Sequence, residues 1–556
     1  MYNKDMFENN LVKLNNTRLK EELQNIPLSS CTNDIAFVQT LGGQIVFLKG
    51  EIPTDDTTDP VAYAKNLITD DMKNFGTNDI IVCVGIGVGY ILDELFTSTK
   101  AKIVIFEPDS KFLRFVFETV DLTQYLSDKR VFISDNAEEC VYFILKNYLN
   151  DDKLEFVVSP ILSIFYKDDF EKFSEILYSK LKSKIVDINT IKVLAKKWAY
   201  NVLNFANLNK KYYSIEDFKW KFTGKNALIL GAGPSLKDNI ENIKNNRDKF
   251  VIFAVNKTLE TLEKNNIVPD FAVFADAQGI KTNYHLSEEF TSKLNIIADW
   301  KAETNIANFK SNNFIVYFSD NELFIKKYAR DLDIQLFPAE QTTTILSLIC
   351  ANYMDFEKIY FCGLDLAFKD NQPYGDDNQN NLNFIDNNTA IINNFEKRLV
   401  DVMSITGEMV KTREDYSVFI KNLETIIKTR GLKNLYNITD FGALIEGMTY
   451  TSFDNINIYG TKPDINSEIQ KLPICKKDFT PYIEKEKAAI INIHDNIINR
   501  SPVSLVTKKI VNDTALLYES LQIELIELSR NAGQPGAIDE FYSKCILAID
   551  NLLARM

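Results

Sequence analysis

Short apolar runs alternate with amphipathic segments through the middle of the chain. Between residues 216 and 455, such runs recur at intervals that leave room for a helix or a turn after each of them. This alternation favours a mostly parallel sheet covered by helices. The runs predicted as strands are Ala227–Leu230, Val251–Val255, Phe271–Phe274, Leu294–Ile297, Phe314–Phe318 and Ile359–Cys362.

A similar pattern occurs nearer the N-terminus. The apolar run Asp79–Ile86 enters the glycine-rich turn Gly85–Gly89, and an amphipathic segment and a second run, Ala101–Phe106, follow. The second run ends in Glu107-Pro108-Asp109, which places acidic side chains where a ribose hydroxyl could bind in a Rossmann-like unit. The alternative is that these glycines only let the strand and the helix pack closely together.

The remaining patterns are mainly helical. Residues 185–212 have helical spacing and are expected to connect two domains, and the pattern is helical again from about Pro481 onward. Residues 370–388 are rich in Asn, Asp and Gln and are expected to form a long loop. We therefore predict an α/β protein with an N-terminal α/β domain (1–215), a central Rossmann-like domain with a mostly parallel sheet (216–455) and a C-terminal helical domain (456–556).

Composition narrows the functional class. The chain has 556 residues, 45% of them hydrophobic and 25% charged, and a net charge of −14. An acidic protein of this kind is not expected to bind nucleic acid through bulk electrostatics. We find no apolar stretch near the ~20 residues needed to span a bilayer and no signal-peptide core in MYNKDMFENN, so we expect a cytoplasmic protein without a membrane span. The seven scattered cysteines and two histidines favour buried free thiols and not a zinc site.

The segment Asn226–Asn256 carries the strongest chemical signal. Its first apolar run ends in Gly231-Ala232-Gly233-Pro234-Ser235, an amphipathic segment follows, and a second run ends at Asn256. This order predicts a strand, a tight glycine turn, a helix and a second strand. Backbone N–H groups at a helix N-terminus stabilise an anionic phosphate, so the turn indicates a nucleotide or nucleotide-sugar site.

Polar or small residues follow several of the other predicted strands. Open parallel sheets bind ligands at the carboxyl ends of their strands, so we expect these residues to lie at one edge. Besides the glycine turn, they are Asn256, Asp276, Gln278, Gln341–Thr344, Gly363, Leu364 and Asp365, with Tyr374 just beyond in the predicted loop. Each also has a structural interpretation, since Asp365 or Thr342–Thr344 could cap a helix and Asn256 could be an ordinary turn residue.

Five segments of the chain read GAGPSLKDNI, FAVNKTLE, PDFAVFADAQ, EQTTTILSL and FCGLDLAF. Together they resemble the motility accessory factor family of flagellin glycosyltransferases. A similar order of motifs occurs in bacterial sialyltransferases that use CMP-sialic acid and in archaeal pterin pyrophosphokinases. Residues 434–450 resemble the closing strand of that domain and the segment after it. The resemblance covers residues 215–450, and the N-terminal GIGVGY and FEPD segments extend it over most of the chain.

The resemblance implies transfer of a nonulosonic acid, of the pseudaminic or legionaminic type, from a CMP-activated donor. The acceptors would be Ser or Thr hydroxyls of flagellin, a modification needed for flagellum assembly and motility. By analogy, the residues expected to bind the donor are Gly231, Gly233, Pro234, Ser235, Asn256, Gln278, Thr342, Thr343, Gly363 and Lys411. Those expected to act in catalysis are Asp276, Asp365 and Tyr374, with Tyr374 the nearest candidate for a tyrosine that hydrogen-bonds the departing phosphate.

The general base departs from the sialyltransferase pattern. Those enzymes use a histidine placed before the helix that leads to the closing strand, and here that segment holds Lys411-Thr412-Arg413 and no histidine. His285 and His494 lie in other segments, and each is interpreted as a structural residue. A carboxylate, Asp276 or Asp365, could take the proton, and the basic residues near Lys411 could bind the donor carboxylate.

Two other functions stay open at this point. One is a Mg²⁺-dependent diphosphotransferase like the pterin enzymes, with Asp276 and Asp365 as metal ligands. The other is a non-catalytic flagellin chaperone that docks through its C-terminal helices. For a glycosyltransferase, we expect no permanently bound cofactor and no metal requirement, because CMP is a good leaving group and no DxD motif follows a predicted strand. The sequence leaves the oligomeric state and the donor sugar open.

Overall fold

The structure is a computed structural model. It describes residues 3–31, 35–149, 152–208, 211–277, 285–339, 342–368, 399–456, 460–531 and 533–556. The chain divides into two units, Met1–Asn189 and Thr190–Met556, and the C-terminal helices belong to the same unit as the central sheet. The finer division at residues 215 and 455 stays a prediction.

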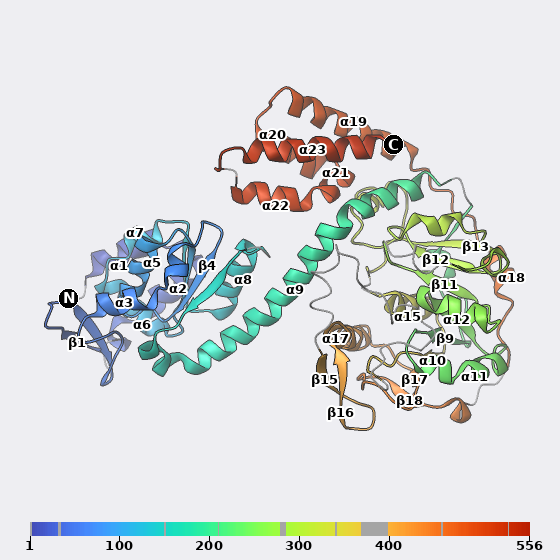
Figure 1. Ribbon diagram of the computed structural model, residues 1–556, viewed down its shortest axis with the longest axis horizontal. Helices are drawn as coiled ribbons and strands as arrows, with labels where there is room; N and C mark the ends of the chain where they lie inside the picture. The colour runs from blue at the N-terminus through green and yellow to red at the C-terminus, as the bar shows by residue number, and fades with distance from the viewer. Residues whose placement is uncertain are drawn as a thin grey trace. The chain divides into compact units, whose positions relative to one another are not determined.

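The N-terminal unit, which begins in blue in Figure 1, contains a parallel sheet of four strands in the order β6-β5-β4-β7. The strands are β4 (Ile80–Val84), β5 (Lys102–Phe106), β6 (Val131–Ser134) and β7 (Leu154–Val157), and β1 (Ile35–Gln39), β2 (Ile45–Lys49) and β3 (Ile52–Pro53) form a separate antiparallel sheet. Its helices are α1 (Lys4–Lys13), α2 (Thr17–Asn25), α3 (Pro60–Leu67), α4 (Asp70–Lys73), α5 (Tyr90–Ser98), α6 (Ser110–Thr119), α7 (Thr123–Leu126) and α8 (Ala137–Asn147). The predicted β-α-β unit is therefore present as β4, α5 and β5.

One long helix crosses the boundary between the units. Helix α9 runs from Pro160 to Ala206, with a kink at Tyr166 where the backbone leaves helical angles. The connecting helix predicted over 185–212 thus begins 25 residues earlier than its pattern indicated. Its last turns, with Ala199, Val202 and Phe205, enter the core of the second unit.

The second unit is built on nine parallel strands in the order β18-β17-β14-β9-β10-β11-β12-β13-β8. The strands are β8 (Tyr213–Ser214), β9 (Asn226–Leu230), β10 (Val251–Val255), β11 (Phe271–Phe274), β12 (Asn295–Asp299), β13 (Asn313–Tyr317), β14 (Lys358–Cys362), β17 (Leu435–Ile438) and β18 (Thr449–Thr451). All six predicted strands are confirmed. The chain leaves β9 in one direction through β10 to β13 and returns on its other side with β14, so the sheet has a topological switch point at β9.

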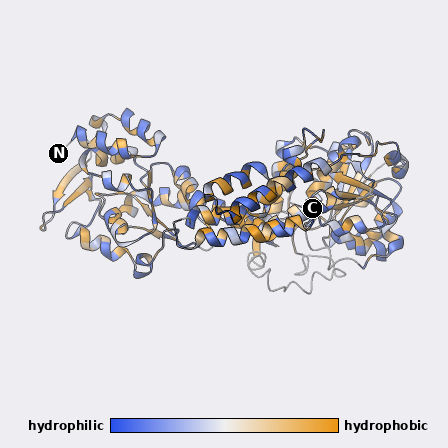
Figure 2. Cartoon of the chain, turned by 90° about the horizontal axis from the view of Figure 1, so that it is seen from above, coloured by the Kyte–Doolittle hydropathy of each residue, from blue (hydrophilic) through white to orange (hydrophobic). Residues whose placement is uncertain are grey.

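Side chains of each inner strand alternate between two hydrophobic cores. In β9, Ala227 and Ile229 face one core, which includes α15 (Thr343–Tyr353) and α17 (Glu414–Thr429). Leu228 and Leu230 face the other. That second core includes α10 (Ser235–Asp238), α11 (Ile240–Asn245), α12 (Leu259–Lys264), α13 (Glu288–Thr291), α14 (Leu323–Tyr328) and the end of α9. A strand buried on both faces reads as a continuous apolar run, which is why these strands were recognisable; Figure 2 shows them in orange among helices striped with both colours.

The C-terminal region is helical, as expected, and continues the second core. Its helices are α18 (Ile465–Gln470), α19 (Thr480–Ile498), α20 (Val503–Asp513), α21 (Ala515–Ser520), α22 (Gln522–Asn531) and α23 (Ala537–Leu553). A buried carboxylate ties them to the sheet: Glu486 of α19 accepts hydrogen bonds from Lys327 Nζ (2.6 Å) and Tyr328 Oη (2.8 Å) of α14. It also accepts one from the backbone N–H of Ala515 (2.8 Å), at the start of α21.

The structure bears on two expectations drawn from the composition, one about the cysteines and one about membrane-spanning helices. All seven cysteines are free; six are buried and Cys475 is partly exposed, as expected for small apolar side chains. Within the described ranges, no helix combines the length and the apolar composition needed to cross a membrane.

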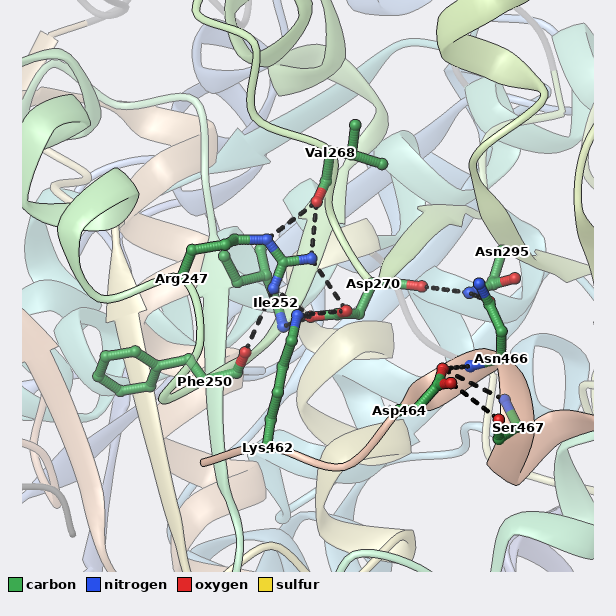
Figure 3. A network of polar contacts seen from close by, with 10 residues as sticks. All are labelled: Arg247, Phe250, Ile252, Val268, Asp270, Asn295, Lys462, Asp464, Asn466 and Ser467. Atoms are coloured by element: carbon green, nitrogen blue, oxygen red, sulfur yellow. Dashed lines mark hydrogen bonds and ion pairs between the residues drawn. The ribbon is translucent and has the colours of Figure 1, made fainter. Parts of the chain in front are cut away.

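A second polar network holds the segment before α18 at the amino edge of the sheet. Asp270 precedes β11 and is 8% exposed, and its carboxylate accepts two hydrogen bonds from Arg247, at 2.8 and 2.9 Å (Figure 3). It also binds Lys462 Nζ, at 2.6 and 2.8 Å, and the N–H of Ile252 at 2.8 Å. Two cations and one backbone amide occupy the hydrogen-bonding positions of this carboxylate. Asp270 therefore has a structural role at the amino edge of the sheet, opposite the carboxyl ends of the strands.

We expect Asp270→Asn to lower the free energy of unfolding by about 3 kcal/mol, because it leaves the partly buried Arg247 and Lys462 without their counter-charge. Urea unfolding followed by tryptophan fluorescence would measure it. Asp464→Asn is the matched control: Asp464 caps α18 through the N–H groups of Asn466 and Ser467, and asparagine caps a helix about as well as aspartate, so the cost should stay below about 0.5 kcal/mol. Equal losses in the two variants would contradict the assignment.

Candidate active site

The glycine turn after β9 lies directly against the turn after β14. The N–H of Gly231 donates to the carbonyl of Cys362 and that of Gly233 to the carbonyl of Gly363, both at 2.8 Å. A Cβ atom placed on Gly231 would lie 2.4 Å from the Gly363 oxygen, and one placed on Gly363 would lie 2.1 Å from the Gly231 oxygen. Gly363 also has a positive φ of 78°. The two backbones can therefore approach this closely only if both positions are glycine.

A buried side-chain pair locks the two turns together. Ser235 and Asp365 are each 1% exposed. The Ser235 hydroxyl donates to Asp365 Oδ1 at 2.6 Å, the Ser235 N–H donates to Oδ2 at 2.8 Å, and the N–H of Gly363 donates to Ser235 Oγ at 3.0 Å. The sequence left open whether Asp365 is catalytic or a helix cap, and this geometry makes it an acceptor for the first N–H of α10.

These bonds change what the turn can offer a ligand. The sequence indicated open N–H groups for a phosphate, yet those of Gly231, Gly233 and Ser235 all donate within the protein. Pro234 has no N–H group. Among the described residues of this turn, the N–H of Ala232 is therefore the one without an acceptor in the protein. Residues 232–234 are partly exposed, so a ligand would meet this short backbone stretch and not a full anion cradle.

Asn256 and Asp276 come together at the same edge of the sheet. Asn256 follows β10 and is 8% exposed, whereas Asp276 follows β11 and is exposed. The Asn256 amide nitrogen donates to Asp276 Oδ2 at 3.3 Å. Since β10 is the neighbour of β9, this pair lies beside the glycine turn. Of the two predicted carboxylates, Asp276 and Asp365, Asp276 is therefore the one that is exposed to solvent.

Of the other predicted residues, some lie at the starts of helices and some lie outside the described ranges. Thr342 caps α15, accepting from the N–H of Ile345 at 3.2 Å, and Thr343 is the first residue of that helix and is 8% exposed. Pro234 immediately precedes α10. Gln278, Gln341, Tyr374 and the predicted loop 370–388 lie outside the described residues.

Lys411 lies on a two-stranded hairpin of β15 (Leu399–Met403) and β16 (Met409–Arg413). Its ammonium pairs with Asp401 of the facing strand at 2.8 Å, and both side chains are about half exposed. Its backbone carbonyl accepts from the N–H of Phe368. The hairpin therefore borders the segment after Asp365, but the Lys411 charge is directed to Asp401, and Arg413 likewise pairs with Asp415.

Three residues to which the sequence assigned no role shape the site. Asn437 of β17 is fully buried and donates to the carbonyl of Leu364 at 2.8 Å, and the buried Thr412 hydroxyl donates to the carbonyl of Leu366 at 2.6 Å. Gly442 packs on Asp365, where a Cβ atom would lie 2.6 Å from the Asp365 carbonyl oxygen. Leu366 has a positive φ of 48°, a strained conformation for leucine. Only the polar residues at the ends of β16 and β17 could have been noticed in the sequence.

The N-terminal glycine turn is filled by the protein's own carboxylates. Glu107, fully buried, accepts from the N–H of Ile86 at 2.9 Å, and Asp55 accepts from the N–H of Val88 at 2.9 Å. A Cβ atom on Gly87 would lie 2.7 Å from an Asp55 oxygen. Burial raises the pKa of Glu107 to about 7 and that of Asp55 to about 6. This favours the packing interpretation of these glycines over a ribose site at Glu107.

The described cavity of 680 Å³ is not lined by any residue of the turns after β9 and β14. It is a surface hollow beside the second half of α17, lined by Lys421, Ile427, Lys428, Leu432 and Glu446 among others. Its lining mixes both signs of charge, and none of the predicted site residues lines it. We therefore place the candidate site at the carboxyl ends of the strands and not in this hollow.

Comparisons with known proteins agree with this fold. The MAf glycosyltransferase from Magnetospirillum magneticum AMB-1 aligns over 99% of this chain and 95% of its own, with a TM-score of 0.61 and 16% sequence identity. The chain shares the fold of that enzyme. At this identity the likeness concerns the fold alone.

Two sequence comparisons cover smaller parts of the chain. A family model described as 6-hydroxymethylpterin diphosphokinase MptE-like matches residues 200–371, the region from the end of α9 through the glycine turns. An uncharacterized protein of Treponema pallidum (strain Nichols) is 31% identical over 137 residues. That match spans 24% of this chain and 62% of the relative.

The backbone contact between the two turns predicts a strong effect of adding one methyl group. We expect Gly231→Ala to lower the free energy of unfolding by about 2–4 kcal/mol, because the new Cβ must push apart the ends of β9 and β14. Gly533→Ala is the matched control, since a Cβ there meets nothing within 4 Å, and it should change stability by less than about 0.5 kcal/mol. Urea unfolding of both variants measures this, and an unaltered Gly231→Ala midpoint would contradict the contact.

The N-terminal carboxylates predict that this unit becomes less stable as the pH rises. An unfolded glutamate loses its proton near pH ~4.3, whereas buried Glu107 keeps it to about 7, so between those values the folded state binds more protons. Unfolding should become easier by up to about 3 kcal/mol across this window. Hydrogen exchange of residues 80–92, corrected for intrinsic rates, would show protection falling from pH 5 to pH 8, and Glu107→Gln should remove most of the change.

Proposed function

We propose that the chain is a glycosyltransferase that moves a nonulosonic acid, of the pseudaminic or legionaminic type, from a CMP-activated donor to Ser or Thr of flagellin. The observation that carries this proposal is the polar carboxyl edge at the switch point beside β9. It occurs in a fold shared along almost the whole chain with a MAf glycosyltransferase. The motifs quoted above for the motility family lie on the elements that form this edge.

The donor would lie over the exposed part of the glycine turn. Ala232, Gly233 and Pro234 present a small, rigid surface there, and the N–H of Ala232 is available to a phosphate oxygen. Asn256, held next to Asp276, would contact the nucleotide from the β10 side. Rigidity matters here because positioning contributes more than nucleophile activation when the leaving group is good.

The reaction needs one proton acceptor. The acceptor hydroxyl oxygen forms a bond to the anomeric carbon of the nonulosonic acid, the bond from that carbon to the phosphate oxygen breaks, and CMP leaves with the bonding electrons. The hydroxyl proton must pass to a base within hydrogen-bond reach. Asp276 suits this role because its carboxylate is exposed and has the Asn256 amide as its hydrogen-bond donor.

Asp365 has a different role in this proposal. Both of its oxygens accept hydrogen bonds from Ser235, and its side chain is buried. A base engaged in this way would have to break the lock between the two turns before it could accept a proton. We therefore assign Asp365 to holding the donor-binding turn in shape and Asp276 to the chemistry.

A diphosphotransferase is the second candidate, favoured by the MptE-like match over residues 200–371. Such chemistry requires carboxylates that converge on Mg²⁺. In the part of the chain that the structure describes, no three His, Cys, Asp or Glu side chains are grouped to hold a metal ion. The engagement of Asp365 with Ser235 also removes one of the two expected ligands. A Mg²⁺-dependent transfer of diphosphate from ATP by the purified chain would support this alternative.

The two aspartates should fail in different ways. We expect Asp276→Asn to retain CMP binding but to reduce transfer by about 100-fold or more, as for loss of a general base. Asp365→Asn should weaken CMP binding and transfer together, because the turn loses its lock. Calorimetry with CMP measures binding, and intact-mass analysis of flagellin co-expressed with the chain and a CMP-nonulosonate pathway measures transfer. Wild-type transfer by a folded Asp276→Asn variant would exclude Asp276 as the base.

The histidines provide matched controls for the same assay. His285 is exposed, and His494 lies on α19 with Nδ1 3.8 Å from Asp495. We expect His285→Gln and His494→Gln to transfer within ~3-fold of the wild type, because neither is needed as a base. A ~1,000-fold loss in folded His285→Gln would instead make that histidine the base. Unmodified flagellin with the wild-type chain would favour the chaperone interpretation.

A further inference from the structure

Three buried carboxylates lie near the carboxyl ends of β12 and β13, where α14 and α21 pack: the charge of Asp299 acts on Glu322, and that of Glu322 acts on Glu519. Asp299 is the last residue of β12, Glu322 immediately precedes α14, and Glu519 lies in α21. Each is at most 3% exposed. None has a part in the proposed reaction, so their burial needs a separate physical reason.

The three side chains differ in how they are compensated. Asp299 Oδ1 accepts from the N–H of Lys301 and from the Ser319 hydroxyl, both at 3.1 Å. Glu322 accepts from the N–H groups of Phe324 (2.9 Å) and Ile325 (2.5 Å) at the start of α14. Oε2 of Glu519, in contrast, is buried and has no hydrogen-bond partner among the described residues.

Among the described residues, Lys301 is the cation whose charge acts on Glu322 and Glu519. The Lys301 ammonium hydrogen-bonds to Asn321 and lies 5.3 Å from the centre of the Trp198 ring. On the neighbouring helices, Lys327 is already paired with Glu486. Burial is the main cause that raises the pKa of both Glu322 and Glu519; the Glu322 charge raises that of Glu519 further, Asp299 raises that of Glu322, and Lys301 lowers both. Three negative charges with one nearby ammonium would be a costly arrangement in a dry contact.

We propose that Glu519 is neutral and protonated in the folded chain, and that this proton keeps α21 seated against α14. The neutral side chain removes one of the three buried negative charges and lowers the cost of burying the oxygen that has no partner. Loss of the proton would leave an anion with an unpaired oxygen between the sheet edge and the C-terminal helices. The contact between α21 and α14 is therefore a pH-sensitive joint within the second unit.

The direction of the pH effect follows from proton counting. An unfolded glutamate loses its proton near pH ~4.3, whereas folded Glu519 keeps it to higher pH. Between these points the folded chain binds more protons than the unfolded chain, so the free energy of unfolding falls as the pH rises. The joint is strongest in mildly acidic solution and weakens toward alkaline pH.

Glu519→Gln tests this directly in the full chain, because the amide has the shape of the protonated acid and cannot ionise. We expect its Tm to exceed that of the wild type by about 2–4 °C at pH 8 and to equal it at pH 5. Glu484→Gln, at an exposed position on α19, is the matched control and should follow the wild type at both values. A Glu519→Gln variant that is destabilised equally at both pH values would overturn the proposal.

A second measurement on the wild type does not depend on the variant folding. Hydrogen exchange of residues 515–520, corrected for intrinsic rates, should show protection that falls between pH 6 and pH 8. Residues 345–353 of α15, on the other face of the sheet, are the internal reference and should keep their protection. Constant protection of 515–520 across this range would show that Glu519 carries no proton that matters to the joint.

Discussion

The unhindered approach of the Gly231 and Gly363 backbones sets the geometry of the carboxyl edge. Because neither position has a Cβ atom, the ends of β9 and β14 can turn over each other at hydrogen-bond distance. The Ser235–Asp365 pair then fixes that contact, while Asn437, Thr412 and Gly442 hold the segment after Asp365 from the other side. The exposed part of the edge, with Ala232 and Asp276, is therefore supported on both sides by buried polar contacts.

The strands were predictable because they are buried on both faces and read as unbroken apolar runs. Shorter edge strands such as β8 (two residues) and β18 (three residues) carry no such pattern, and they appear only through their pairing with β13 and β17. The sequence also could not predict that the C-terminal helices pack against the central sheet. Apolar spacing on α19 to α23 shows which face is buried but not against which partner it packs.

At the candidate site, position in the sequence identified the residues but not the hydrogen bonds that they make. Gly231, Ser235, Asp365 and Asn256 lie where the strand-end rule placed them. That the Ser235 N–H and hydroxyl are taken by Asp365 depends on a contact across 130 residues, which no local pattern encodes. The same limit applied to the N-terminal turn, where Asp55 comes from a segment 33 residues before the N–H that it accepts.

The second core has a consequence for synthesis of the chain on the ribosome. Trp300 and Phe324, at the edge formed by β12, β13 and α14, pack on Phe479, and Tyr328 packs on Tyr482, at the start of α19. These partners leave the ribosome well after the strands that they cover, and at about 5–20 residues per second the last helix follows the last strand by several seconds. During that interval part of a completed sheet presents bare aromatic surface. The nascent chain is therefore a natural client for a holding chaperone, and a stop codon before α19 would leave that surface permanently uncovered.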